Sequence, residues 1–297
     1  MPFVNLSDDP GQEYLSDGIS EDIITALSRF RWFFVIARNS SFAYRGTAVD
    51  VKQVARELGV QYVLAGSLRR AGNRVRVSAQ LVETASGHHV WAERYDRDID
   101  DIFALQDDIT ESIVSTVGSE FWSAKMRRAQ RADPQHLSAW HCLMRAGWHH
   151  ARYTKADVIE AQRLLHQALD LDPASAQSYC LLAFTHLMQA QFGWSESTDD
   201  SIEQAATAAG RAVELDDRDA WAQTAMGLVD LNSRRHNQAI ARFEKAIDLN
   251  PSLAHAYAAL GQAVALAGDH ERAEVQIRRA IRLSPMSDPE RWVTFCT

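Results

Sequence analysis

The hydrophobic positions in the second half of the chain recur with a fixed period. Aligning residues 254–285 with residues 220–251 pairs Leu260 with Met226 and Ile277 with Phe243. The prolines that follow, Pro251 and Pro285, are 34 positions apart. Within each period the apolar residues return at three- and four-residue steps, which predicts helices. Each period therefore contains two helices joined by a turn.

A 34-residue period of two antiparallel helices is typical of the tetratricopeptide repeat (TPR). Gly227 and Gly261 allow the paired helices to approach closely, while Phe243 and Ile277 fill the space between neighbouring hairpins. Because one hairpin cannot bury its apolar face alone, stacked neighbours supply the core. We expect hairpins over 134–172, 173–216, 217–250 and 251–284, followed by a partial helix in 285–297.

The outer copies of the repeat are less regular. Pro134 and Pro173 begin the two upstream hairpins, and an insertion around 192–197 separates the helices of the second. The last segment, 285–297, carries Trp292 and Phe295 and has no polar cap. Terminal repeats normally need such a cap. We therefore expect either that the chain continues beyond this segment or that the segment docks as a cap.

The pattern of residues 1–100 is different and predicts helices and strands in alternation. Ser20, followed by two acidic residues, is typical of a helix N-cap. The apolar run 33–37 predicts a buried strand. A second helix is expected over 49–58, with Gly59 ending it.

Three further strands follow these helices. The segments 61–68, 74–81 and 89–95 predict strands, and in the second of them apolar and polar residues alternate, as in a half-buried strand. A long helix is expected from Ile102 to Arg128. The predicted fold class is α+β: a small mixed sheet with helices on one face over residues 1–128, then an all-α TPR superhelix over 129–297.

Composition narrows the functional classes. The formal net charge of −8 and the isoelectric point near 5.8 argue against a nucleic-acid binder, which usually has a basic excess. The basic cluster 125–131 is interpreted as the end of a helix. Cys142, Cys180 and Cys296 form no paired motif, so we expect buried thiols, a reducing compartment and a cytoplasmic protein. Neither a membrane span nor a secretory signal is predicted.

No motif for catalysis stands out. The chain contains no phosphate-binding loop and no G-x-S-x-G elbow. The pairs His88-His89 and His149-His150 are adjacent in sequence, and neighbouring residues on a helix cannot both face one metal ion. We therefore expect no enzymatic activity, no cofactor and no metal.

Two polar segments of the N-terminal half have alternative explanations. The segment 91–97 mixes charges and aromatic rings, and it either forms ion pairs that fix the sheet to the long helix or offers a surface to an upstream domain. The polar segment 39–44 either holds its loop against the sheet or lines a cleft for a small ligand.

The TPR pattern also predicts where a partner binds. In such arrays the first helix of each hairpin lines a groove for a peptide or helix. The register places Gln177, Cys180, Phe184, Trp221, Thr224, Leu228, His255, Ala258 and Gln262 as exposed groove positions. Trp221 serves either in partner binding or in packing between hairpins. The two-Lys/Asn clamp that binds acidic C-termini is missing, and His255 and Asn232 replace it poorly.

A string of short motifs in the N-terminal half resembles a known family. The motifs are Asn5-Leu6-Ser7, Asp17-Gly18, Ile36–Tyr44, Val54–Val60, Trp91–Arg97 and Ile102–Gln106. Together they resemble the TolB-amino-terminal-like α/β domain that precedes TPR repeats in bacterial signalling proteins. Only Met1 precedes Pro2-Phe3, where the family has more apolar residues, so we expect a shortened first strand.

This resemblance implies a function. In the family, the module follows an effector domain, either a class III adenylate/guanylate cyclase or a winged-helix DNA-binding domain. We expect a non-catalytic regulatory module that binds a protein, a peptide or an upstream effector domain through its TPR groove. The alternatives are the regulatory half of a class III cyclase and the regulatory half of a winged-helix regulator.

Overall fold

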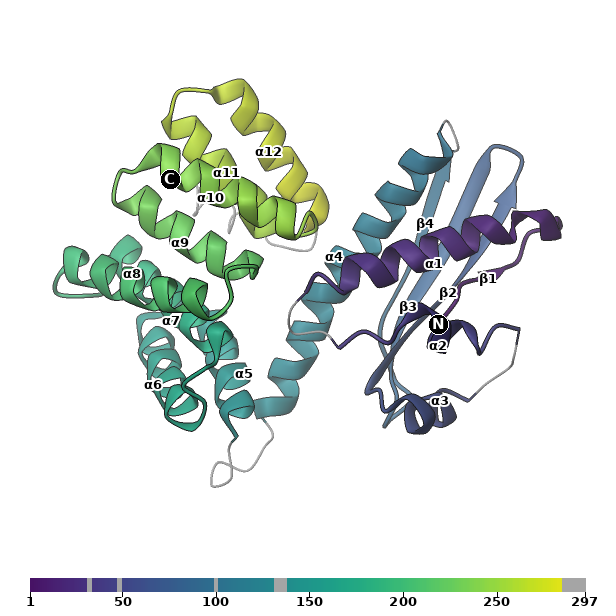
Figure 1. Ribbon diagram of the computed structural model, residues 1–297, viewed down its shortest axis with the longest axis horizontal. Helices are drawn as coiled ribbons and strands as arrows, with labels where there is room; N and C mark the ends of the chain where they lie inside the picture. The colour runs from purple at the N-terminus through teal and green to yellow at the C-terminus, as the bar shows by residue number, and fades with distance from the viewer. Residues whose placement is uncertain (31–33, 47–49, 99–100, 131–137, 285–297) are drawn as a thin grey trace. The chain divides into compact units, whose positions relative to one another are not determined.

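The fold combines a small sheet with an array of helical hairpins. The computed structural model describes residues 1–30, 34–46, 50–98, 101–130 and 138–284. It separates into two compact units, Met1–Phe121 and Trp122–Thr297. The first unit holds a four-stranded mixed sheet, and the second is built from paired helices (Figure 1). The fold class is therefore α+β, as the sequence predicted.

The sheet of the first unit follows chain order. Its strands are β1 (Val4–Asn5), β2 (Tyr62–Ala71), β3 (Arg74–Glu83) and β4 (His89–Asp98). The short β1 runs parallel to β2, whereas β2, β3 and β4 are antiparallel. Gly72 sits in the β2–β3 turn with φ +59°, a conformation that suits glycine.

Two helices cover one face of this sheet (Figure 1). They are α1 (Glu13–Leu27) and α4 (Ile102–Gln130). The predicted alternation of β3 is confirmed, because Val75 and Val77 are fully buried against these helices. Ile19 of α1 and Ile109 of α4 are likewise inaccessible to solvent, so the core lies between the sheet and the two helices.

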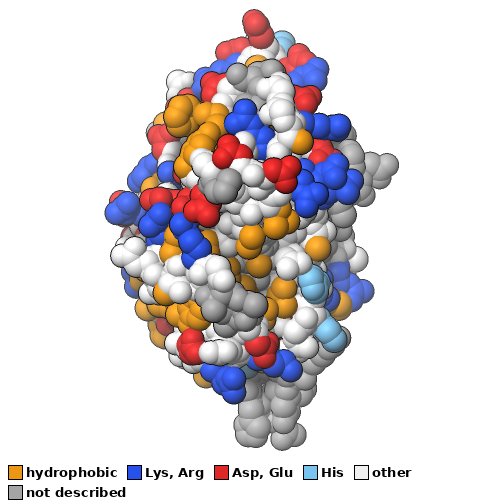
Figure 2. All heavy atoms as spheres, turned by 90° about the vertical axis from the view of Figure 1, so that its right-hand side faces the viewer, with side chains coloured by type: hydrophobic (Ala, Val, Ile, Leu, Met, Phe, Trp, Pro, Cys, Tyr) orange, Lys and Arg blue, Asp and Glu red, His pale blue; other side chains and the backbone are white. Residues whose placement is uncertain are grey.

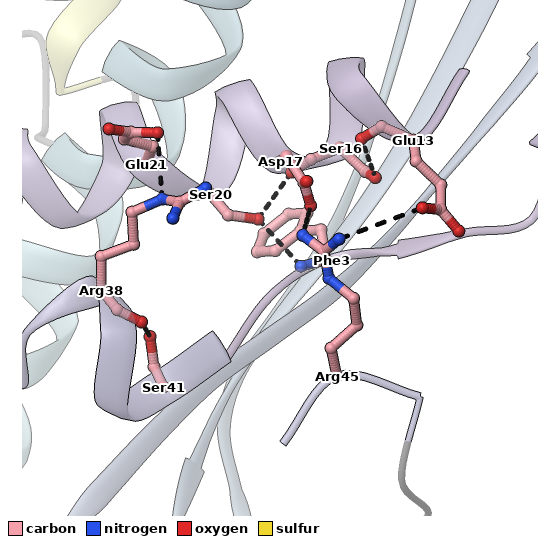
Figure 3. Close-up of polar contacts among 9 residues, drawn as sticks. All are labelled: Phe3, Glu13, Ser16, Asp17, Ser20, Glu21, Arg38, Ser41 and Arg45. Atoms are coloured by element: carbon pink, nitrogen blue, oxygen red, sulfur yellow. Dashed lines mark hydrogen bonds and ion pairs between the residues drawn. The ribbon is translucent and has the colours of Figure 1, made fainter. Parts of the chain in front are cut away.

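The prediction that Ser20 caps a helix is wrong. A 3-10 turn, η1 (Pro10–Gln12), leads into α1, which begins seven residues before Ser20. Ser20 is buried, and its Oγ donates to the carbonyl of Ser16 at 2.6 Å and accepts the N–H of Phe3 at 2.9 Å (Figure 3). The two acidic residues after Ser20 made it resemble a helix cap. Its side chain instead bonds the backbone N–H of Phe3, next to β1.

The predicted strand over 33–37 is also wrong in its described part. Residues 34–37 have no regular secondary structure, and the Phe34 side chain is 90% exposed. A short apolar run has no periodicity that separates a strand from a connection. Here the position beside β2 is taken by β1, and the run leads instead into a short helix, α2 (Arg38–Phe42).

The segment around α2 is held by charged contacts (Figure 3). Arg38 pairs with Glu21 of α1 at 3.0 Å, and Arg45 pairs with Asp17 of the same helix. The two guanidinium carbons lie 4.1 and 5.1 Å from the centroid of the Phe42 ring. These contacts tie the ends of the segment to α1 and do not decide between the two explanations given for residues 39–44.

The helix α3 (Val51–Leu58) confirms the predicted second helix. Asp50 caps it by accepting the N–H of Lys52 at 3.0 Å, and Gly59 ends it with φ +66°. Tyr44, at the end of the preceding segment, donates to Glu57 of this helix. The same segment is therefore tied to α3 as well as to α1.

The ion-pairing explanation of segment 91–97 is supported by a contact to α4. Arg97 donates through Nε to Asp108 at 2.7 Å. This pair joins the end of β4 to the second turn of α4, as that explanation requires. Its contribution to stability is modest, because both side chains are partly exposed.

The second unit consists of four TPR-like hairpins in the described range. They are α5 (Ala139–His150) with α6 (Lys155–Leu171), α7 (Ala176–Phe192) with α8 (Thr198–Leu215), α9 (Ala220–Asn232) with α10 (His236–Leu249), and α11 (Ala254–Leu266) with α12 (His270–Leu283). Most of these helices begin with a side-chain cap. The caps are Ser138, Thr154, Ser175, Ser197, Asp219 and Asp269.

The close approach predicted at the repeat glycines is confirmed. A Cβ at Gly227 would lie 2.5 Å from the Phe243 ring, and a Cβ at Gly261 would lie 2.7 Å from Ile277. Phe243 is fully buried, so its ring occupies the space that a side chain at Gly227 would need.

Some predictions fall outside the described residues. These are the repeat start at Pro134, the strand position Phe33, the helix start at Val49, Arg131 of the basic cluster, and the segment 285–297 with Trp292, Phe295 and Cys296. The long helix α4 is described to Gln130, where the basic cluster was expected to end a helix. Cys142 and Cys180 are buried free thiols, as predicted.

Replacing Gly227 with alanine tests the helix contact. We expect Gly227→Ala to lower the free energy of unfolding by about 1–3 kcal/mol, because the new methyl overlaps the Phe243 ring. Gly210→Ala in α8 is the matched control, since a Cβ there meets nothing within 4 Å. That control should stabilise by about 0.5–1 kcal/mol through helix propensity. Equal effects of both substitutions in urea unfolding would contradict the packing argument.

Replacing Ser20 tests the buried hydrogen bond to β1. Ser20→Ala should cost about 1–3 kcal/mol in chemical denaturation, because the buried N–H of Phe3 loses its acceptor. Ser28→Ala is the control: Ser28 makes a similar bond to the carbonyl of Ile24 but is exposed. If both variants unfold at the same denaturant concentration, the Phe3 bond contributes nothing.

Candidate partner-binding surface

Charge is divided unequally between the two helices of each hairpin. In the first helices, α5, α7, α9 and α11, the only Asp, Glu, Lys or Arg residues are Arg145 and Asp230. The second helices, α6, α8, α10 and α12, carry at least four such residues each. A surface built from the first helices is therefore nearly free of formal charge.

The carboxylate of Asp230 is neutralised locally. Its side chain is only 5% exposed and lies 2.8 Å from the guanidinium of Arg235. Arg242 is a second cation nearby, at 3.9 Å, and it also donates to the buried Gln223 at 2.9 Å. A buried charge needs such partners to offset its desolvation. Asp230 is therefore committed to fixing the α9–α10 turn.

One ring from each first helix contributes to an aromatic cluster, which consists of His150, Phe184, Trp221 and His255. The Phe184 ring lies edge-on to the Trp221 ring at 5.7 Å between centroids and to the His255 ring at 5.6 Å. Trp221 and His255 are 5.4 Å apart, and His150 reaches Phe184 at 6.5 Å. These separations are typical of stabilising aromatic pairs.

The repeat itself explains why these rings meet. Trp221 and His255 are 34 positions apart, and each is the second residue of its helix. Asp219 fixes the start of α9 by accepting the N–H of Trp221 at 2.9 Å. Phe184 and Trp221 both pack against the repeat core while remaining partly exposed. The cluster therefore joins several hairpins and still presents ring surface.

The histidines of the cluster are neutral at physiological pH. Burial lowers the pKa of His150 to about 4. Burial also lowers the pKa of His255 to about 4, and the nearby His150 contributes to this shift. Both side chains remain uncharged above this range, so the cluster acts as an apolar aromatic surface.

The structure divides the nine predicted groove residues into two groups. Gln177, Phe184, Trp221, His255 and Gln262 are partly exposed, and three of them belong to the aromatic cluster. The expectation of exposure is wrong for the remaining four, which are between 0% and 7% exposed: Cys180, Thr224, Leu228 and Ala258.

Packing accounts for part of this burial. Cys180 and Leu228 belong to the main hydrophobic cluster of the repeats, since successive first helices contact one another. Thr224 satisfies its hydroxyl by donating to the carbonyl of Ala220 at 2.8 Å. A repeat register gives the face of a helix, but it does not show how closely the neighbouring helices cover that face.

Sequence reasoning missed His150 as a member of this surface. It considered His149-His150 only as metal ligands and correctly placed the two on different sides of a helix. His149 contacts Asp157 at 2.8 Å in the α5–α6 turn, whereas His150 faces Phe184. The sequence feature that could have identified His150 is its position as an aromatic residue at the end of the first helix of a hairpin. Among the described residues, no group of His, Cys, Asp or Glu is arranged to hold a metal ion.

Charged side chains elsewhere are mixed in sign. On the face shown in Figure 2, Lys and Arg side chains lie beside Asp and Glu, with apolar patches between them. In the described part of the chain, no helix combines the length and apolar character that a membrane crossing requires.

Comparison with known sequences gives two kinds of relatives. No family model matches the chain. It is 42% identical over 216 residues to a putative adenylate cyclase 3 of Rhizobium meliloti (strain 1021), a match that covers 73% of this chain and 37% of that protein. It is 23% identical over 239 residues to the transcriptional regulator HilA of Salmonella typhimurium, covering 80% and 42%. The chain thus spans well under half the length of either relative.

Two solved structures also match part of the chain. A thermophilic TPR protein of Thermus thermophilus, TTC0263, matches 63% of this chain and 98% of its own with 17% identity and a TM-score of 0.49. The crystal structure of MamA matches 58% and 94% with 22% identity and a TM-score of 0.38. The chain itself combines a mixed sheet and TPR-like helical hairpins with sequence similarity to parts of a cyclase and of a transcriptional regulator.

Proposed function

We propose that this chain is a non-catalytic regulatory module whose repeats bind a protein segment through the surface of their first helices. The observation that carries this proposal is the aromatic cluster of His150, Phe184, Trp221 and His255. Its rings come from four hairpins and meet on helices that are almost free of charge. The Phe184 and Trp221 rings remain partly exposed, so part of their surface is open to a partner.

The chemistry of this surface favours one class of partner. Binding energy at protein interfaces is concentrated in a few aromatic anchors surrounded by neutral contacts. Trp221 and Phe184 supply such anchors, and the neutral histidines extend the apolar area. Because acidic tails and nucleic-acid phosphates require cations, the surface suits an apolar polypeptide segment, such as one face of an amphipathic helix.

The similarity to a cyclase and to a transcriptional regulator supports a role in bacterial signalling. The matched region is a minor part of each relative. We assign the first unit to the TolB-amino-terminal-like domains on the motifs in its sequence, and we place the module beside an effector domain in the cytoplasm. The buried free thiols Cys142 and Cys180 are compatible with a reducing compartment.

The effector is the point on which the alternatives differ. The higher identity to the putative adenylate cyclase favours the regulatory half of a class III cyclase, and the weaker match to HilA favours the regulatory half of a winged-helix regulator. The reading frame upstream of Met1 separates them. Metal-binding aspartates of a cyclase would favour the first alternative, and a winged helix would favour the second.

Trp221→Ala tests the partner surface directly. The immobilised chain would be incubated with a lysate of its source organism, and the captured proteins would be quantified by mass spectrometry. We expect capture of the specific partner to fall by about 30-fold, as the loss of an aromatic anchor worth about 2 kcal/mol implies.

The matched control for this experiment is Trp194→Ala. Trp194 stacks on Phe192 at 4.7 Å in the α7–α8 turn and lies outside the aromatic cluster. This variant should capture the same proteins as the wild type. If Trp221→Ala also leaves capture unchanged while remaining folded by circular dichroism, the assignment of the surface is wrong.

A further inference from the structure

The sheet of the first unit ends in a long strand, β4, and no described strand pairs with its outer side. The strand order is β1-β2-β3-β4, so β4 is paired along one edge only, with β3. The other margin of the sheet is the two-residue β1, whereas β4 has ten residues and contains no proline. An unpaired strand of this length offers a row of backbone N–H and C=O groups to another strand.

The middle of β4 is open to solvent. Tyr95 is buried in the core under α1 and α4, and Glu93, two residues earlier, points to the same face of the sheet. Glu93 is nevertheless exposed, as are its neighbours Ala92 and Arg94. The helices that cover this face of the sheet therefore leave the part of β4 around Glu93 uncovered.

The charged side chains of β4 match a second copy of the same strand. In an antiparallel pair, residues directly opposite each other point to the same face. A two-fold symmetric pair centred on Tyr95 places Arg94 opposite Asp96 of the second copy, and Glu93 opposite Arg97 of the second copy. Each contact occurs twice, so four pairs of opposite charge form. No like charges lie directly opposite each other over residues 92–98.

Shifting the centre of the pair by one residue removes this match. A pair centred on Arg94 opposes that guanidinium to itself, and a pair centred on Asp96 opposes that carboxylate to itself. Like charges directly opposite each other destabilise a strand pair. Protecting an edge against other strands requires charge alone, without complementarity to a second copy. The order of signs along β4 therefore selects the register centred on Tyr95.

The contacts within one chain leave these groups able to bind the second copy. Asp96 is already paired with Arg76 of β3 at 2.6 Å, so Arg94 of the second copy would approach it from the other side. Arg97 donates through Nε to Asp108 and through Nη1 to a backbone carbonyl, and Nη2 remains for Glu93 of the second copy. Glu93 accepts from the Tyr95 hydroxyl at 3.0 Å and forms no ion pair with any described residue.

We propose that two copies of this chain pair along β4, antiparallel and centred on Tyr95, and join their sheets into one continuous sheet. Residues 92–98 of each copy form about six to eight backbone hydrogen bonds with the other. Because opposite residues share a face, the α1 and α4 helices of both copies cover the same face of the joined sheet. The inference concerns the first unit and does not depend on the partner surface of the repeats.

Sedimentation equilibrium of the full chain at physiological salt tests this proposal. Over a concentration series, the wild-type chain of 33.3 kDa should reach the mass of a dimer. Arg94→Asp should raise the dissociation constant of the dimer by about 10-fold or more, because attractive cross-strand pairs become repulsive. Arg69→Asp is the matched control. Arg69 is exposed and opposite Arg76 on the same face of the sheet, but it lies on β2, away from the β4 edge, so the dimer should persist.

A mixture of two variants tests the register. Asp96→Lys alone should also weaken the dimer, because a cation at position 96 then faces Arg94 of the second copy. Mixed in equal amounts with Arg94→Asp, it should form a heterodimer of nearly wild-type affinity, because opposite charges face each other again at positions 94 and 96. Recovery in the mixture also shows that both variants are folded.

The remaining outcomes overturn the proposal. A wild-type chain that stays monomeric throughout the concentration series has no such interface. A dimer that Arg94→Asp leaves intact is held by another surface, and a mixture that recovers no heterodimer contradicts the register. An equal loss of dimer in Arg69→Asp would mean that general electrostatics, and not the β4 edge, accounts for the effect.

Discussion

The close approach of two helices at a small residue is the contact on which the repeat unit depends. At Gly227 the Phe243 ring occupies the volume where a side chain would stand, and Gly261 and Ile277 repeat this arrangement in the next hairpin. A single hairpin has too little apolar surface to be stable alone, so each copy needs a neighbour. The hairpins therefore fold only as a stack of repeated copies. This stack places equivalent residues of successive hairpins side by side.

The surface chemistry follows from this stacking. The second helices carry most of the charge, whereas the first helices are nearly uncharged and bring aromatic residues into contact. No single helix could form this cluster, because each contributes only one of its rings. Stacking brings the rings into contact across the hairpins, and burial keeps the two histidines neutral. Under the proposed function, a partner would meet apolar area rather than charge on this surface.

The first unit is held together in a different way. Its sheet buries one face under α1 and α4, but several of its connections depend on polar contacts. Ser20 anchors the backbone beside β1, and two arginines fix the α2 segment to α1 (Figure 3). These contacts join residues far apart in sequence, so no local pattern announces them. This explains why the role of Ser20 was predicted wrongly.

The sequence alone determined the features that arise from periodicity and local chemistry. It determined the 34-residue repeat, the glycine contacts, the long helix α4, the glycine that ends α3 and the alternation of β3, because each depends on residues close together in the chain. Only the tertiary structure decided that Thr224 and Ala258 are closed to solvent, that His150 joins the cluster, and that Phe34 is exposed. The second group of features depends on solvent exposure, which local sequence does not fix. A repeat register gives the direction of a side chain, but the elements packed around it decide whether it meets water.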